Sequence, residues 1–93
     1  MYEWDQAKRE SNLRKHQLDF LVAHLVYESL EKLTYRLKSG LEARYLDVAL
    51  VEFKGAILAL VYTIRSGNIR FISFRYASRR ERRRYAAAKS RYE

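Results

Sequence analysis

The sequence predicts a small α+β domain in which two N-terminal helices and a basic C-terminal helix pack on an antiparallel sheet of about four strands. Residues 5–16 are strong helix formers without proline or glycine. Between residues 33 and 76, alternating and continuously apolar segments follow one another, which is typical of strands. A chain of 93 residues, 48% of them hydrophobic, supports one core and not two, so we expect a single domain over residues 1–93.

The first helix is expected from Asp5 to His16, because Asp5 is a good N-cap. One face of this helix is polar and partly cationic, and it consists of Lys8, Asn12, Lys15 and His16. A second helix is expected to begin at Asp19. Its apolar residues spread over more than half of the helix surface, so we expect it to be mostly buried.

Four strands are expected next, over residues 33–38, 44–53, 56–64 and 69–76. The third is nearly all apolar, which favours a central position in the sheet. The last helix is expected from Arg79 onward, because Ser78 and Glu81 have the spacing of a capping box.

Two arginines on the last strand are candidate functional residues. Arg70 and Arg75 are five residues apart, so their side chains are expected on opposite faces unless the strand bulges between them. Arg75 lies at the strand end, where an arginine is normally exposed, and is the better phosphate ligand. Arg70 is interpreted as structural or partner-facing.

The charge distribution indicates an anionic partner. The net charge is +8, and residues 75–93 hold eight basic and two acidic residues, a net charge of +6. Nucleic acid or an acidic protein surface would fit this segment, although a solvated helix without a partner is also open. No apolar run reaches the ~20 residues of a membrane span. The absence of cysteine and the non-cationic start fit a cytoplasmic protein.

The histidines give no metal-ligand motif, and we expect no metal and no cofactor. His24 lies between apolar residues and is interpreted as a core or boundary histidine. His16 ends a cationic helix face, and a helix C-terminus favours the imidazolium form, which suits a phosphate contact or an acid role. A helix cap is an equally good interpretation of His16.

Two segments resemble the BrnT family of bacterial toxins. The first is Glu3-Trp4-Asp5 with Lys8, Asn12 and Lys15-His16, and the second runs from residue 69 to residue 82, followed by Tyr85. Between them, Glu42 and Arg44 resemble the family's Gly-Glu-x-Arg element. Three positions differ from the family pattern: Gln17 and Leu41 replace glycine, and Tyr76 replaces lysine.

The resemblance implies the toxin of a type II toxin–antitoxin system with a RelE-like fold. Such a toxin cleaves RNA without a metal, inhibits translation and is neutralised by a BrnA-like antitoxin. The antitoxin carries a ribbon-helix-helix DNA-binding domain, so the toxin reaches DNA only through it, and two-fold pairing predicts a heterotetramer.

Metal-free RNA cleavage needs proton transfer and stabilisation of negative charge. Arg75 and Arg44 are the candidate phosphate ligands, His16 is the candidate acid or base, and Lys8 is a supporting cation. Lys15, Arg79, Arg80 and Arg83 are expected to bind RNA, and Arg70, Arg80, Arg83 and Arg84 to bind the partner. A non-catalytic module that binds RNA or DNA, with tyrosines as stacking platforms, and a partner-docking protein are the alternatives.

Overall fold

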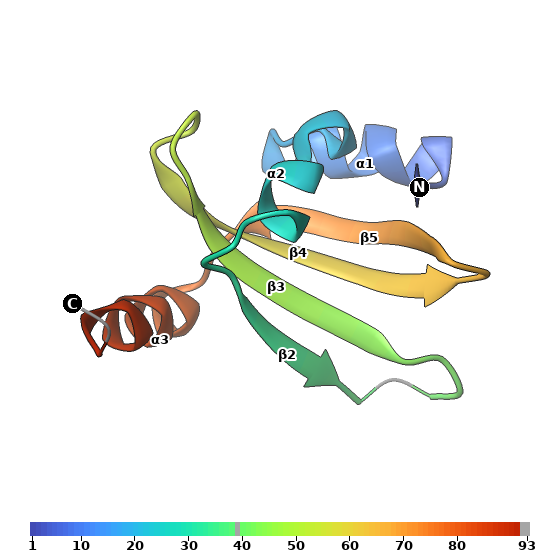
Figure 1. Cartoon of the computed structure of the whole chain (residues 1–93). Helices are drawn as coiled ribbons and strands as arrows, with labels where there is room; N and C mark the ends of the chain where they lie inside the picture. The colour runs from blue at the N-terminus through green and yellow to red at the C-terminus, as the bar shows by residue number, and fades with distance from the viewer. Residues whose placement is uncertain (39, 92–93) are drawn as a thin grey trace.

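The computed structural model describes residues 1–38 and 40–91 and shows an α+β fold built on one five-stranded mixed sheet (Figure 1). The strand order is β1-β5-β4-β3-β2, and only the β1–β5 pair is parallel. The elements are β1 (Tyr2–Glu3), α1 (Gln6–His16), the 3₁₀ helix η1 (Phe20–Val22), α2 (His24–Tyr27), β2 (Leu33–Leu37), β3 (Arg44–Val51), β4 (Ala56–Arg65), β5 (Asn68–Tyr76) and α3 (Arg79–Ser90). The four expected strands are confirmed, with their ends shifted by up to two residues.

The expectation of an all-antiparallel sheet is wrong, because β1 adds a parallel edge strand. Tyr2 and Glu3 pair with Ile69 and Arg70 on β5. Aromatic packing holds this short strand in place: the ring of Phe71 stacks on Tyr2 at 5.2 Å and on Trp4 at 5.9 Å between centroids. Two residues are too few to give a periodic sequence signal, so the strand depends on these tertiary contacts.

The first helix begins and ends as predicted. The side chain of Asp5 accepts hydrogen bonds from the backbone N–H groups of Ala7 (2.8 Å) and Lys8 (3.2 Å). The helix ends at Gln17, which has φ of 57° in the left-handed region, and its N–H donates to the carbonyl of Leu13. A non-glycine residue therefore makes the turn that places His16 at the end of α1.

The second helix is much shorter than expected. Asp19 caps it by accepting from the N–H of Leu21 at 3.1 Å, but the segment forms the 3₁₀ turn η1 followed by one turn of α2. Phe20, Ala23 and Val26 are fully buried at a spacing of three residues, which matches the three residues per turn of a 3₁₀ helix. The expectation of a mostly buried helix is wrong because Leu21, Leu25 and Leu30 are exposed to solvent.

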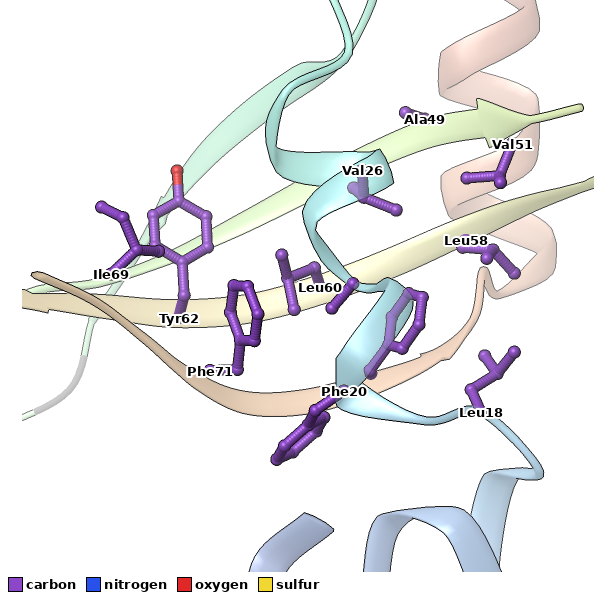
Figure 2. Packing of buried hydrophobic residues seen from close by; sticks show 12 residues of the cluster. Leu18, Phe20, Val26, Ala49, Val51, Leu58, Leu60, Tyr62, Ile69 and Phe71 are labelled. Carbon is purple, nitrogen blue, oxygen red and sulfur yellow. The ribbon is translucent and has the colours of Figure 1, made fainter. Parts of the chain in front are cut away.

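The helices cover the two faces of the sheet unequally. In Figure 1, α1 and α2 lie on one side of the sheet and α3 on the other. Figure 2 shows the larger core beneath η1 and α2, where Phe20, Leu60 and Phe71 meet. On the opposite face, α3 inserts Tyr85 against Val48 and Ala59, and part of this face stays open. No helix within residues 1–38 and 40–91 is long and apolar enough to cross a membrane.

Candidate functional site

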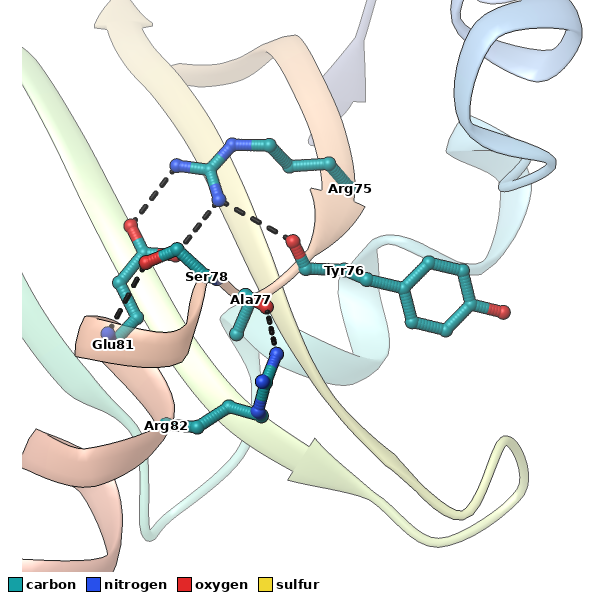
Figure 3. Close-up of polar contacts among 6 residues, drawn as sticks. All are labelled: Arg75, Tyr76, Ala77, Ser78, Glu81 and Arg82. Atoms are coloured by element: carbon teal, nitrogen blue, oxygen red, sulfur yellow. Dashed lines mark hydrogen bonds and ion pairs between the residues drawn. The ribbon is translucent and has the colours of Figure 1, made fainter.

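Arg75, at the end of β5, forms a two-point ion pair with Glu81 in the first turn of α3 (Figure 3). Its Nη1 donates to Oε1 of Glu81 at 2.7 Å, and its Nη2 donates to Oε2 at 3.0 Å. Nη1 also lies 3.4 Å from the carbonyl oxygen of Tyr76. These contacts fix the guanidinium in one orientation beside the strand end.

Glu81 also closes the predicted capping box. Its Oε1 accepts from the N–H of Ser78 at 2.8 Å, while the hydroxyl of Ser78 accepts from the N–H of Glu81 at 3.2 Å. The hydrogen bond with Arg75 is the main reason that the pKa of Glu81 falls from 4.5 to about 2. The arginine side chain is 30% exposed, so the expectation of a freely exposed strand-end arginine is wrong.

Arg75 nevertheless keeps hydrogen-bonding capacity for a ligand. A guanidinium has five N–H groups, and the contacts above engage three of them. Within the described residues, its Nε–H and one N–H of Nη2 make no hydrogen bond. An arginine that is oriented by a carboxylate and still has free donors is suited to hold a phosphate oxygen.

His16 reaches the same end of β5 from the other side of the sheet. Asn12, one turn earlier on α1, fastens the helix to the strand edge: its amide donates to the carbonyl of Phe74 at 2.8 Å and accepts from the N–H of Phe74 at 2.9 Å. A third bond runs to the carbonyl of Leu18 at 3.0 Å. Asn12 is buried, so it belongs to the fold and not to the open cationic face predicted for α1.

The protonation preference of His16 is opposite to the expected one. Partial burial lowers the pKa of His16 below its usual 6.5, and the positive charges of Lys15 and Arg75 lower it further. This direction is opposite to the one that a helix C-terminus favours. The neutral imidazole is therefore favoured. The hydrogen bonds between Asn12 and Phe74 bring the last turn of α1, which carries His16, to the strand end that carries Arg75.

A β-bulge corrects the expected directions of Arg70 and Arg75. Ser73 pairs with Val61, but Phe71 pairs with Tyr62, so one extra residue interrupts β5 between them. Arg70 and Arg75 consequently pair with Thr63 and Ala59, which are four residues apart on β4. Because an even spacing places side chains on the same face of a strand, both arginines share the face of the sheet that α3 covers. The expectation of opposite faces is wrong.

Arg44 is not brought together with Arg75. Arg44 pairs with Thr63 on β4, whereas Arg75 pairs with Ala59 on the same strand. The two pairing positions are four residues apart, which is about 13 Å along β4. Nε of Arg44 lies 3.8 Å from Glu42 and makes no hydrogen bond within the described part of the chain.

The other predicted cations fall into three groups. Lys8 and Lys15 are exposed on α1. Arg70 pairs with Glu3 at 2.8 Å, which ties β1 to β5. On α3, Arg84 lies 5.8 Å from the centre of the Tyr35 ring, and three further arginines are exposed: Arg79, Arg80 and Arg83.

Asp47 is a buried charge that the sequence analysis does not single out. Its carboxylate accepts hydrogen bonds from Lys32 at 2.7 Å, from Thr34 at 2.7 Å and from Tyr62 at 3.1 Å. These contacts join β2, β3 and β4. Burial raises the pKa of Tyr62, and the charge of Asp47 raises it further. The group is satisfied within the fold, so we interpret it as structural.

The described residues contain no group of three or more His, Asp or Glu side chains placed to hold a metal ion. His24 is half-buried, with its ring 6.1 Å from that of Tyr2, as expected for a boundary histidine.

The comparisons with known proteins agree with the geometry. A comparison with curated proteins gives no match. A family model described as the ribonuclease toxin BrnT of a type II toxin–antitoxin system matches residues 4–81. The matched span extends from Trp4 to Glu81 and includes both His16 and Arg75. The chain therefore belongs to the BrnT family of ribonuclease toxins of type II toxin–antitoxin systems.

Proposed function

We propose that this chain is a metal-independent endoribonuclease that inhibits translation by cutting RNA in the cytoplasm. The observation that carries the proposal is that Asn12 fastens the last turns of α1, which end at His16, to Phe74, the residue before Arg75 on β5. The pKa of His16 is lowered, and the guanidinium of Arg75 is oriented by Glu81. Arg75 is next to the arginine-rich start of α3, where the positive charge can draw RNA toward the site.

In the proposed reaction, the ribose 2′-hydroxyl attacks the adjacent phosphorus. Neutral His16 takes the proton of the hydroxyl, because its lowered pKa keeps the imidazole unprotonated near neutral pH. The P–O2′ bond forms as the P–O5′ bond breaks, and the imidazolium returns the proton to the 5′ oxygen. Arg75 donates hydrogen bonds to the non-bridging oxygens, which gain negative charge in the transition state.

The remaining cations bind the RNA around this centre. Lys8 and Lys15 are proposed to contact the backbone on the α1 side, and Arg79, Arg80 and Arg83 to contact it on the α3 side. Because Arg44 is about 13 Å away along the strands, we assign it to a phosphate remote from the bond that is cut.

The test is cleavage of end-labelled RNA by purified protein in EDTA. His16→Gln is expected to lower the rate by about 10²–10⁴-fold. Arg75→Lys keeps a positive charge for Glu81 but loses the planar fork, and it is expected to lower the rate about a hundredfold. Lys54→Gln, an exposed cation on the β3–β4 turn, is the matched control and should cleave like the parent.

Folding of each variant is checked by its thermal unfolding midpoint. If both site variants are folded and cleave at the parent rate, the assignment of His16 and Arg75 is wrong. If the parent binds RNA and does not cleave it, the chain is a non-catalytic RNA-binding module instead.

We also propose that a BrnA-like antitoxin with a ribbon-helix-helix domain covers the open part of the α3 face. This surface combines Arg70 and Arg84 with the half-buried side chains of Tyr35 and Val61. An acidic segment with apolar side chains would complement it and would exclude RNA. Two-fold pairing of the antitoxin would then give a heterotetramer that contacts DNA only through the antitoxin.

Charge reversal of Arg80 and Arg83 tests this docking surface. Both are exposed, so Arg80→Glu with Arg83→Glu should slow association and weaken its dependence on salt while monomer stability changes little. A control double variant, Lys38→Glu with Lys54→Glu, changes the net charge equally but lies outside α3. Equal association rates for the two double variants at low salt would show that α3 is not the docking surface.

A further inference from the structure

A shallow apolar hollow of about 400 Å³ lies at the end of the sheet, next to the Arg75–Glu81 pair. It is lined by the β3–β4 hairpin, the end of β5 and the first turns of α3, through Leu50, Gly55, Ala56, Ile57, Tyr76, Ala77 and Arg82. Neither hydrophobic core includes Tyr76, whose exposed fraction is 48%, and Leu50 is 42% exposed. An aromatic ring and an aliphatic side chain are therefore left open to solvent beside the proposed catalytic centre.

One cation that lines the hollow, Arg82, and a second beside it in the chain, Arg75, indicate what kind of ligand it takes. Arg82 donates from Nη1 to the carbonyl of Ala77 at 2.7 Å, which holds its guanidinium at the wall of the hollow. Arg75 precedes Tyr76 in the chain, and Figure 3 shows its guanidinium and the tyrosine ring directed to opposite sides of the strand end. An apolar surface with an aromatic ring beside two guanidinium groups matches a nucleotide, whose base is flat and whose phosphates are anionic.

We propose that this hollow is a subsite for one nucleobase of the RNA, stacked on Tyr76, with the flanking phosphates on Arg75 and Arg82. The inference rests on the proposed ribonuclease function and adds a residue that determines substrate affinity. The base belongs to a nucleotide that flanks the cut bond, because the ring points away from the guanidinium of Arg75.

The experiment uses a 2′-O-methyl RNA, which cannot be cleaved, with 2-aminopurine at each position in turn. Stacking on Tyr76 should quench the fluorescence at one position in the parent protein and in Tyr76→Phe, and Tyr76→Ala should abolish the quenching. Loss of one stacked base should weaken RNA binding about 5- to 150-fold. Phe53→Ala is the matched control, because Phe53 is a more exposed aromatic residue that does not line the hollow.

A second arm measures cleavage of natural RNA and of RNA with an abasic nucleotide at the quenched position. Tyr76→Ala should lower kcat/KM about 5- to 150-fold on natural RNA and have little further effect on the abasic RNA. If Tyr76→Ala and Phe53→Ala behave alike in both arms, the subsite is overturned. It is also overturned if Tyr76→Ala weakens only antitoxin binding, because the hollow then belongs to the protein interface.

The two arms separate this inference from the proposed function. If the parent does not cleave but the quenching depends on Tyr76, the base subsite stands and the ribonuclease proposal fails. If the parent cleaves and Tyr76→Ala cleaves equally well, the ribonuclease proposal stands and the subsite fails.

Discussion

Replacing Glu81 by glutamine separates the two roles of this side chain. Glutamine can still complete a capping box with Ser78, so the start of α3 should keep its cap. The substitution removes the negative charge that pairs with Arg75 and leaves a part-buried guanidinium without a counter-ion. The loss of stability therefore reports mainly on the ion pair that orients Arg75.

The pKa of Glu81 gives the size of the effect. Its fall from 4.5 to about 2 corresponds to at most about 3 kcal/mol, at 1.36 kcal/mol per pKa unit. Because the folded pKa is the lower one, this stabilisation is fully present above pH 4.5 and is lost as the pH falls toward 2. At pH 3 about 1 kcal/mol should remain.

The assay is urea denaturation of the parent and of Glu81→Gln at pH 7 and pH 3. The free energy of unfolding should differ by about 2–3 kcal/mol at pH 7 and by about 1 kcal/mol at pH 3, at equal m-values. Glu52→Gln, an exposed carboxylate in the β3–β4 turn, is the control and should change stability by less than about 0.5 kcal/mol. A difference that is the same at both pH values would refute the assignment to this ion pair.

Three further predictions follow from the same contacts. Ser78→Ala should lower the free energy of unfolding by about 1 kcal/mol, measured by urea denaturation, and an unchanged midpoint would contradict the cap. Asn12→Ala should cost about 2–4 kcal/mol because it leaves buried groups of β5 unpaired, whereas exposed Ser11→Ala on the same helix should cost far less. The value of kcat/KM should decrease toward acid pH with an apparent pKa below 6.5, because His16 must be neutral to accept a proton. In His16→Gln this decrease should be absent.

Much of the fold could be predicted because its signals are local. The alternation of apolar residues indicates strands β2 to β5, and the side chains of Asp5 and Ser78 mark the starts of α1 and α3. The elements that were missed depend on distant contacts. The β1 strand depends on rings stacked against Phe71, and the bulge in β5 has no signature in composition or period.

The candidate site could be predicted only in part. Arg75 and His16 are identified by their motifs, and the bonds of Asn12 to Phe74 hold the helix that ends at His16 against the strand that carries Arg75. The capping spacing reveals Glu81, but its second contact, with Arg75, depends on how α3 leaves the strand. Arg44 is displaced from Arg75 by the register of β3 and β4, which a single sequence does not reveal.

The ends of the RNA fragments made by the purified toxin in EDTA test the proposed chemistry most directly. Attack by the 2′-hydroxyl, with His16 and Arg75 in the roles given above, predicts a 2′,3′-cyclic phosphate on one fragment and a 5′-hydroxyl on the other. Fragments that carry a 3′-hydroxyl and a 5′-phosphate would contradict attack by the 2′-hydroxyl, and cleavage that stops in EDTA and returns with Mg²⁺ would contradict a metal-independent mechanism.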